Sequence, residues 1–195
     1  MNVPNLLTLS RIFLTLGFIF FIKQGDVFSV CLAGFFFVLA SVTDYYDGYF
    51  AKKHNQVSNF GKIMDPIADK FLILSAFYIF MRMHIVASWI FYLIALREIL
   101  LTGFRLTAML LGKILAAERA GKIKTVLQMS SIWVILLSLV LQDLHIFRAR
   151  EMFGGQFFFQ FWQISIDVLL IMTVIATLYS GIIYLFNNRV CLANT

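Results

Sequence analysis

The chain has 195 residues, a formal net charge of +6 and a mean hydropathy of +0.88, and only 13% of its residues are charged. A soluble domain is usually about one quarter charged, so the composition excludes an ordinary soluble domain and indicates a membrane protein. The length permits about six apolar spans of roughly 20 residues each and leaves no room for a soluble domain. We therefore expect one membrane domain over residues 1–195.

Apolar runs predict helices near residues 6–22, 27–51, 63–82, 86–111, 122–142 and 162–187. The expected fold class is all-α, an integral membrane bundle of six transmembrane helices with both termini on one side. Residues 143–161 form the only long loop of this prediction, and its aromatic side chains suit an anchor at the membrane interface. Asp167, near the outer end of the last helix, is expected at the interface or bonded to a neighbouring helix.

Basic residues are distributed unevenly between the two sides of the expected bundle. The side that holds the termini carries Lys52, Lys53, Lys62, Lys113, Arg119, Lys122, Lys124 and Arg189, and the opposite loops carry Lys23, Arg82, Arg148 and Arg150. The positive-inside rule then places the termini in the cytoplasm of a multi-pass protein. Lys53 and Lys113 are explained equally well as lipid-facing charges.

The remaining bulk features predict no processing or cross-linking. Met1 leads directly into an apolar run with no small-residue cleavage site, so we expect no cleaved signal peptide. Cys31 and Cys191 are few and far apart, so we expect no disulfide framework.

Four carboxylates lie at the ends of two neighbouring apolar runs: Asp44, Asp47, Asp65 and Asp69. A charged side chain near the bilayer centre costs roughly 2.5 kcal/mol or more, so packing alone does not explain them. The spacings of three and four residues put each pair on one helix face, and a short connection lets the two helices lie antiparallel. Carboxylates without His or Cys suit Mg²⁺, Mn²⁺ or Ca²⁺ rather than zinc. Because four exceed what one Mg²⁺ takes from protein, we expect two metal ions of the kind that promote phosphodiester chemistry.

Small residues accompany the carboxylates. Gly48 and Ala51 follow Asp47, and Gly61 precedes Asp65 by four residues. Together they leave a notch in which a bulky ligand can approach the backbone. Helix–helix packing is the alternative explanation for each glycine alone, and for Gly48 in particular.

The spacing of these residues resembles the signature of the CDP-alcohol phosphotransferase family, D-x-x-D-G-x-x-A-R, eight residues, then G-x-x-x-D-x-x-x-D. Every fixed position matches except the arginine, where this chain has Lys52. The resemblance implies that the hydroxyl of one alcohol attacks a CDP-linked alcohol, forming a phosphodiester and releasing CMP. It also implies Mg²⁺ or Mn²⁺ as cofactor and a homodimer.

The resemblance assigns roles to the signature residues. Asp44, Asp47 and Asp65 would be metal ligands, and Asp69 would be both a metal ligand and the catalytic base. The nucleotide and its diphosphate would lie against Asn5, Thr8, Gly48, Ala51, Lys52 and Gly61. Asn5 also suits a helix cap. Lys52 keeps the charge of the family's arginine but loses its bidentate geometry, so nucleotide affinity is in question.

Three further stretches, 4–11, 97–106 and 121–129, are similar to the bacterial family members that make phosphatidylglycerophosphate from CDP-diacylglycerol and glycerol 3-phosphate. An anionic acceptor needs cations near the carboxylates, and the candidates for binding its phosphate are Arg97, Arg105, Lys122 and Lys124. Arg97 is alternatively a structural ion pair with Glu98, and Lys122 an interfacial lysine.

The expected function is therefore transfer of a phosphatidyl group to glycerol 3-phosphate at the cytoplasmic face of a bacterial inner membrane. The same chemistry with phosphatidylglycerol or inositol phosphate as acceptor remains an alternative. A divalent-cation transporter is the alternative from another class. It is disfavoured because the carboxylates gather on one side, while the outer halves of the second and third helices are hydrophobic, as in 35–39 and 73–77.

Overall fold

The computed structural model describes residues 3–54, 59–110, 119–143 and 155–188, and side chains within 8–43, 64, 66–109, 121–142 and 160–188. These residues form six α-helices and no strand, which confirms the all-α prediction. The helices are α1 (Val3–Ile22), α2 (Val27–His54), α3 (Asn59–Arg82), α4 (Ser88–Leu110), α5 (Arg119–Asp143) and α6 (Gly155–Asn187).

The helix boundaries agree with the apolar runs except at the start of α6. That helix begins at Gly155, so residues 155–161 are helical and the prediction of a loop there was wrong. The segment from Gln156 to Phe161 contains no helix breaker, and its phenylalanines continue the apolar run of the helix. The rest of the predicted loop, 144–154, lies outside the described residues.

The turn between α1 and α2 is fixed locally. Gly25 has a φ of 80°, a conformation that favours glycine. The Asp26 carboxylate then accepts a hydrogen bond of 3.0 Å from the backbone N–H of Ser29 and caps the start of α2. This hydrogen bond lowers the pKa of Asp26 below its ordinary value.

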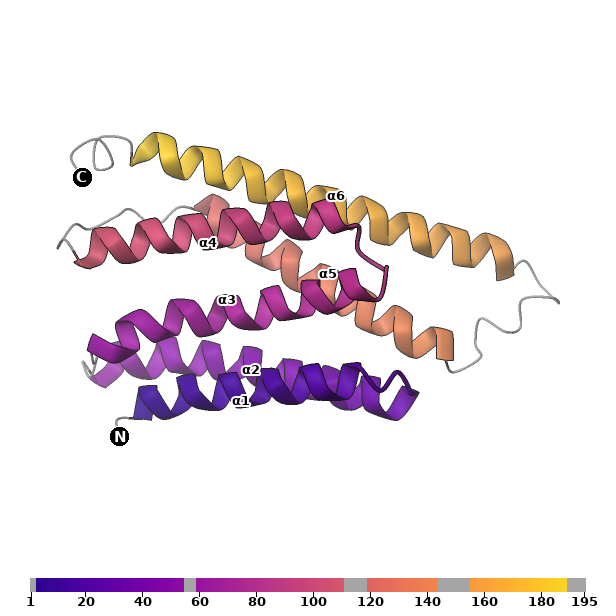
Figure 1. Cartoon of the computed structure of the whole chain (residues 1–195), viewed down its shortest axis with the longest axis horizontal. Coiled ribbons are helices and arrows are strands. Elements are labelled where there is room, and N and C mark those ends of the chain that lie inside the picture. The colour runs from indigo at the N-terminus through magenta and orange to yellow at the C-terminus, as the bar shows by residue number, and fades with distance from the viewer. Residues whose placement is uncertain (1–2, 55–58, 111–118, 144–154, 189–195) are drawn as a thin grey trace.

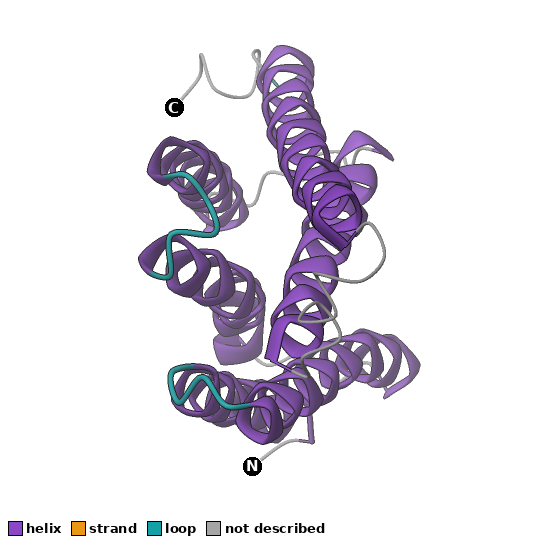
Figure 2. Ribbon diagram, turned by 90° about the vertical axis from the view of Figure 1, so that its right-hand side faces the viewer, coloured by secondary structure: helices purple, strands orange, loops and turns teal. Residues whose placement is uncertain are grey.

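The helices run roughly along one long axis, so the start of α1 and the end of α6 lie at the same end of the bundle (Figure 1). The α1–α2 and α3–α4 turns lie together at the opposite end, which faces the viewer in Figure 2. Helix α1 packs mainly on α2 and α3, α4 packs on α3 and α6, and α5 packs on α6.

Large aromatic side chains fill the centre of the bundle. Phe18 of α1 and Phe37 of α2 are fully buried, with ring centroids 5.7 Å apart, and Phe37 also meets Trp133 of α5 at 5.8 Å. Phe77 and Phe80 of α3 are buried in the same cluster. This core joins the helices around the middle of the bundle.

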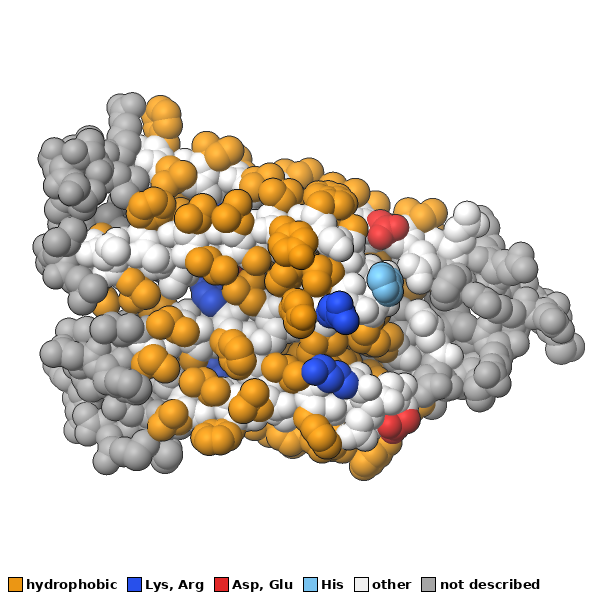
Figure 3. All heavy atoms as spheres, in the orientation of Figure 1, with side chains coloured by type: hydrophobic (Ala, Val, Ile, Leu, Met, Phe, Trp, Pro, Cys, Tyr) orange, Lys and Arg blue, Asp and Glu red, His pale blue; other side chains and the backbone are white. Residues whose placement is uncertain are grey.

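Hydrophobic side chains cover much of the described face of the bundle that Figure 3 shows. By length and composition, two described segments could cross a membrane, Gly121–Gln142 and Gln160–Asn187, and α1 and α2 contain shorter apolar stretches. The apolar stretches of α3 and α4 are interrupted by the charged residues that form the site below, notably Asp69, Lys70, Arg97 and Glu98.

Candidate active site

A cavity of about 620 Å³ lies between α3, α4, α5 and α6. Its charged lining residues are five cations and two carboxylates: Lys70, Arg97, Arg105, Lys122, Lys124, Asp69 and Glu98. The volume is within the usual range of small-molecule sites. The excess of basic residues makes the cavity suited to an anionic ligand.

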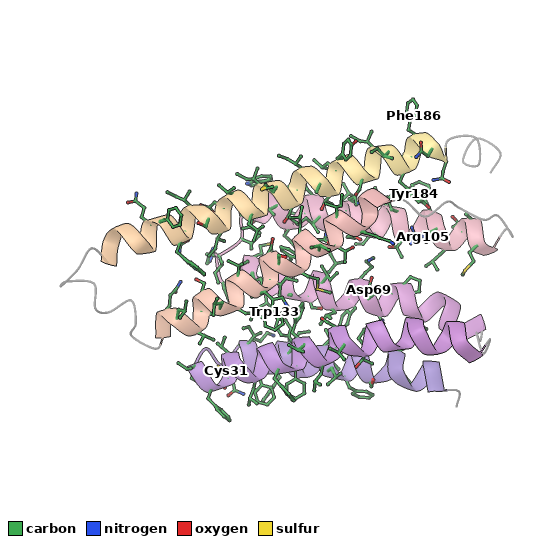
Figure 4. The ribbon with its side chains drawn as sticks, turned by 180° about the vertical axis from the view of Figure 1, so that it is seen from behind. Cys31, Asp69, Arg105, Trp133, Tyr184 and Phe186 are labelled. Carbon is green, nitrogen blue, oxygen red and sulfur yellow. The ribbon has the colours of Figure 1, made fainter. Side chains whose placement is uncertain are left out.

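The cavity brings together the residues proposed for the acceptor phosphate and the proposed base. Arg97 and Arg105 come from α4, Lys122 and Lys124 from α5, and Asp69 from α3, and all of them line the cavity. Asp69 and Arg105 lie toward the same end of the bundle, and Cys31 lies toward the other end (Figure 4). Residues more than 50 positions apart in the sequence therefore share one site.

Glu98 is the most buried charged group of the site, with a side chain only 2% exposed. Its Oε1 accepts a hydrogen bond from Lys124 Nζ and others from Arg97 Nη1 at 3.1 Å and Gln128 Nε2 at 3.3 Å. The ion pair between Arg97 and Glu98, one of the two explanations for Arg97, is thus present. An ion pair does not prevent Arg97 from also facing a ligand, because its side chain lines the cavity.

Lys70 connects Glu98 to the proposed base. Its Nζ lies 2.6 Å from Asp69 Oδ2 and 3.6 Å from Glu98 Oε2. Asp69 is 26% exposed, so its carboxylate remains accessible from the cavity. Such an accessible carboxylate can accept a proton from a bound hydroxyl group.

Helix α6 supports both arginines of α4. Ser180 Oγ accepts a hydrogen bond of 2.7 Å from Arg97 Nη2, and the Arg105 guanidinium lies 5.8 Å from the centre of the Tyr184 ring. Between them, Gly181 leaves room for Arg97, because a Cβ there would lie 3.3 Å from Arg97 Cγ. The Arg105–Tyr184 contact has the geometry of a cation–π interaction and is visible in Figure 4.

The other predicted site residues lie near the same end of the bundle, but most of their side chains are outside the described set. Asp44, Asp47, Gly48, Ala51 and Lys52 belong to the C-terminal part of α2. Gly61 and Asp65 belong to the first half of α3, and Asn5 to the first turns of α1. Thr8 of α1 is the one residue of the predicted nucleotide site whose side chain is described, and this side chain is buried. Within the described side chains no cluster of three or more His, Cys, Asp or Glu occurs.

Several cavity residues were not recognised as site residues in the sequence. Lys70 carries a detectable signal, since a lysine inside an apolar run is rarely placed there without function. Ser180 and Tyr184 carry none, because each is an ordinary residue of a long apolar helix. Only the fold places them beside the arginines of α4.

The whole sequence can also be compared with models of known protein families. A model of CDP-alcohol phosphatidyltransferases matches residues 1–186 of the chain. The chain belongs to this family. The family predicted from the aspartate signature is thereby confirmed, and the transporter alternative is excluded.

Several proteins with known names are similar to this chain. A phosphatidyltransferase of Bacillus subtilis (strain 168) is 38% identical over 70% of this chain and 77% of its own length, and its name is CDP-diacylglycerol–glycerol-3-phosphate 3-phosphatidyltransferase. Proteins of the same name from Rickettsia felis and Escherichia coli (strain K12) are 38% and 34% identical. These matches cover 70% and 69% of this chain and 75% and 76% of the relatives.

Proposed function

We propose that this phosphatidyltransferase transfers the phosphatidyl group of CDP-diacylglycerol to a hydroxyl group of sn-glycerol 3-phosphate. The products are phosphatidylglycerophosphate and CMP, so the enzyme acts in phospholipid biosynthesis. Membership of the family and the names of the relatives support the reaction and both substrates. The basic cavity supports a small phosphorylated acceptor, because a cavity with more cations than carboxylates favours a ligand of net negative charge, and neither zwitterionic serine nor cationic choline has one.

The observation that carries this proposal is the position of Asp69. It is the last residue of the aspartate signature and it also lines the cavity that holds the four candidate phosphate-binding cations. A base must lie within reach of the hydroxyl that it deprotonates while the rest of the acceptor is held in place. Asp69 meets this requirement if the acceptor phosphate is bound by Arg97, Arg105, Lys122 and Lys124.

The chain's own residues divide the work between two halves of the site. The cations of α4 and α5 orient glycerol 3-phosphate with the attacking hydroxyl group toward α3, and Asp69 takes the proton of that hydroxyl group. Asn5, Thr8, Gly48, Ala51, Lys52 and Gly61 accommodate the cytidine diphosphate at the ends of α1, α2 and α3. Lys52 supports the diphosphate with one point charge in place of a planar guanidinium.

The carboxylates Asp44, Asp47, Asp65 and Asp69 would hold two divalent ions, Mg²⁺ or Mn²⁺. The donor set fits these ions, because four carboxylates without sulfur or imidazole favour hard cations. When bound, the ions would neutralise the diphosphate and the departing CMP.

The proposed setting is the inner membrane of a bacterium, with all six helices spanning the bilayer. The arrangement of the helix ends supports it, since α1 begins and α6 ends at one end of the bundle, where α2, with Lys52 and Lys53, also ends and α3, with Lys62, begins. The many outward-facing apolar side chains, such as Phe13, Tyr92 and Ile182, support contact with lipid. The site then faces the cytoplasm, from which glycerol 3-phosphate arrives, and we propose a homodimer as the assembly.

The acceptor is tested by product analysis. Purified protein in detergent, supplied with CDP-diacylglycerol and Mg²⁺, is offered glycerol 3-phosphate, inositol phosphate or phosphatidylglycerol, and the lipid product is identified by mass spectrometry. We expect phosphatidylglycerophosphate from the first reaction and little product from the others. Cardiolipin or an inositol lipid as the dominant product would keep the chemistry and replace the acceptor.

A further inference from the structure

We infer that Glu98 is a positioning residue for this reaction, which sets the geometry of the acceptor cations relative to Asp69. The inference rests on the proposed function, because it assigns the acceptor to this cavity. Glu98 does not match any position of the aspartate signature, and at 2% exposure it contributes almost no surface to the cavity. Its influence on a ligand must therefore pass through its neighbours.

The two oxygens of Glu98 face different partners. Oε1 accepts hydrogen bonds from Lys124 of α5 and Arg97 of α4, and Gln128 adds a third from one turn beyond Lys124. Oε2 faces Lys70 of α3 at 3.6 Å. One buried carboxylate thus contacts cations from three helices, and charge-assisted hydrogen bonds of this kind restrict the orientation of both groups.

The contacts continue on both sides of Glu98. Lys70 reaches Asp69 Oδ2 at 2.6 Å, and Arg97 reaches Ser180 of α6 at 2.7 Å. A continuous chain of polar contacts therefore runs from the proposed base, through Lys70, Glu98 and Arg97, to the opposite wall of the cavity. Lys124 of α5 also bonds to Glu98, so all four helices that line the cavity are linked through this carboxylate. Glu98 therefore determines how far the acceptor cations lie from Asp69.

The cations fall into two groups with respect to Glu98. Arg97 and Lys124 are bonded to it, whereas Arg105 and Lys122 have no carboxylate partner among the described side chains and are exposed. Arg105 is held by the Tyr184 ring instead. The exposed pair supplies charge for the incoming phosphate, and Glu98 holds Arg97 and Lys124 in position.

A positioning role and a purely electrostatic role of Glu98 predict opposite changes in the KM for glycerol 3-phosphate. If Glu98 acted only through its negative charge, its removal would make the cavity more positive and would lower the KM for anionic glycerol 3-phosphate. If Glu98 acts by positioning, its loss releases Arg97 and Lys124, and the KM for the acceptor rises. The sign of the change therefore decides between the two roles.

The experiment compares Glu98→Gln, which keeps the reach and removes the charge, with Glu98→Asp, which keeps the charge and shortens the reach. Steady-state CMP release is measured while glycerol 3-phosphate and CDP-diacylglycerol are varied in turn. We expect both variants to raise the KM for glycerol 3-phosphate roughly ten- to a hundredfold, the usual cost of losing a residue that orients ligand-binding groups. The KM for CDP-diacylglycerol is expected to stay within about twofold of wild type, since the cavity cations are not proposed to bind it.

An unchanged or lowered KM for glycerol 3-phosphate in both variants would overturn the inference. Glu98→Asp preserves the charge balance around Lys124, so it keeps the test available if Glu98→Gln does not fold, as judged by size-exclusion chromatography. Asp167→Asn is the matched carboxylate control, because Asp167 is exposed on α6 and does not line the cavity. Wild-type protein that releases no CMP with glycerol 3-phosphate would instead contradict the proposed function, so the two failures are distinguishable.

Discussion

At the scale of single residues, Arg105 offers a direct test of the acceptor cavity. It is exposed, lines the cavity and lies over the ring of Tyr184. It can therefore bind an incoming phosphate without first breaking an ion pair with a carboxylate. We expect Arg105→Ala to raise the KM for glycerol 3-phosphate about tenfold or more, since a hydrogen bond to a charged group contributes about 1.5–3 kcal/mol. Arg105→Lys should fall between this variant and wild type, because the charge remains but the planar contact is lost.

Tyr184 supplies the matched control for that prediction. Tyr184→Phe keeps the ring under Arg105 and removes a hydroxyl that is buried without a hydrogen-bond partner among the described residues. The KM of Tyr184→Phe for glycerol 3-phosphate should therefore stay close to the wild-type value. The KM of Tyr184→Leu should rise about as much as that of Arg105→Lys. Equal effects of the Phe and Leu variants on the KM would contradict a role for the ring.

The sequence predicted part of this site at the residue scale. Asp69 was selected as the last residue of the aspartate signature. Arg97, Arg105, Lys122 and Lys124 were selected because an anionic acceptor needs cations near the carboxylates, and all five residues line one cavity. Glu98 was recognised only as an ion-pair partner of Arg97, because a sequence does not reveal that its carboxylate also meets Lys124 and Lys70. Ser180 and Tyr184 were missed, since their role depends on which face α6 turns toward α4.

At the scale of helices, the contact between α1 and α2 can be tested at a glycine. A Cβ at Gly17 of α1 would lie 2.8 Å from Cδ1 of Phe36, a ring that packs against the core. Overpacking by Gly17→Ala should lower the free energy of unfolding by about 1–3 kcal/mol. The higher helix propensity of alanine should offset up to about 1 kcal/mol of this loss. The change should appear as a lower thermal unfolding temperature in detergent.

Gly34 of α2 is the control for the same substitution. A Cβ there meets nothing within 4 Å, so Gly34→Ala should leave the stability unchanged or raise it slightly through helix propensity. If both variants unfolded at the wild-type temperature, α1 and α2 would not pack as described.

Helix existence was predictable because each apolar run is long and bounded by turns or charges. The α1–α2 turn at Gly25 and Asp26 and the bounds of α3 match the prediction within a few residues. The predicted start of α6 was seven residues too late. An aromatic segment near a membrane interface is consistent both with an anchoring loop and with the first turns of a helix. Of the helix contacts, the sequence predicted only that of α2 with α3 through their short connection, so the contacts of α1 with α3 and of α4 with α6 were not foreseen.

At the scale of the whole molecule, the proposed orientation in the membrane makes a labelling prediction. Cysteines are introduced at Lys23, in the α1–α2 turn, and at Lys53, near the end of α2, after Cys31 and Cys191 are changed to serine. These positions lie at opposite ends of the bundle. A membrane-impermeant maleimide added to intact bacteria should label Lys23→Cys and should reach Lys53→Cys only after lysis. The reverse pattern would place the site on the outer side.

The most direct test of the central claim is CMP release by the purified protein with CDP-diacylglycerol, Mg²⁺ and glycerol 3-phosphate, measured for wild type and Asp69→Asn. We expect CMP release from the wild type to depend on glycerol 3-phosphate. In the variant we expect kcat to fall by at least roughly 10²–10⁴-fold, the usual contribution of a general base, with any loss of metal binding lowering it further. Folded wild-type protein that releases no CMP, or an Asp69→Asn variant that works at the wild-type rate, would contradict the proposed reaction and the role of Asp69.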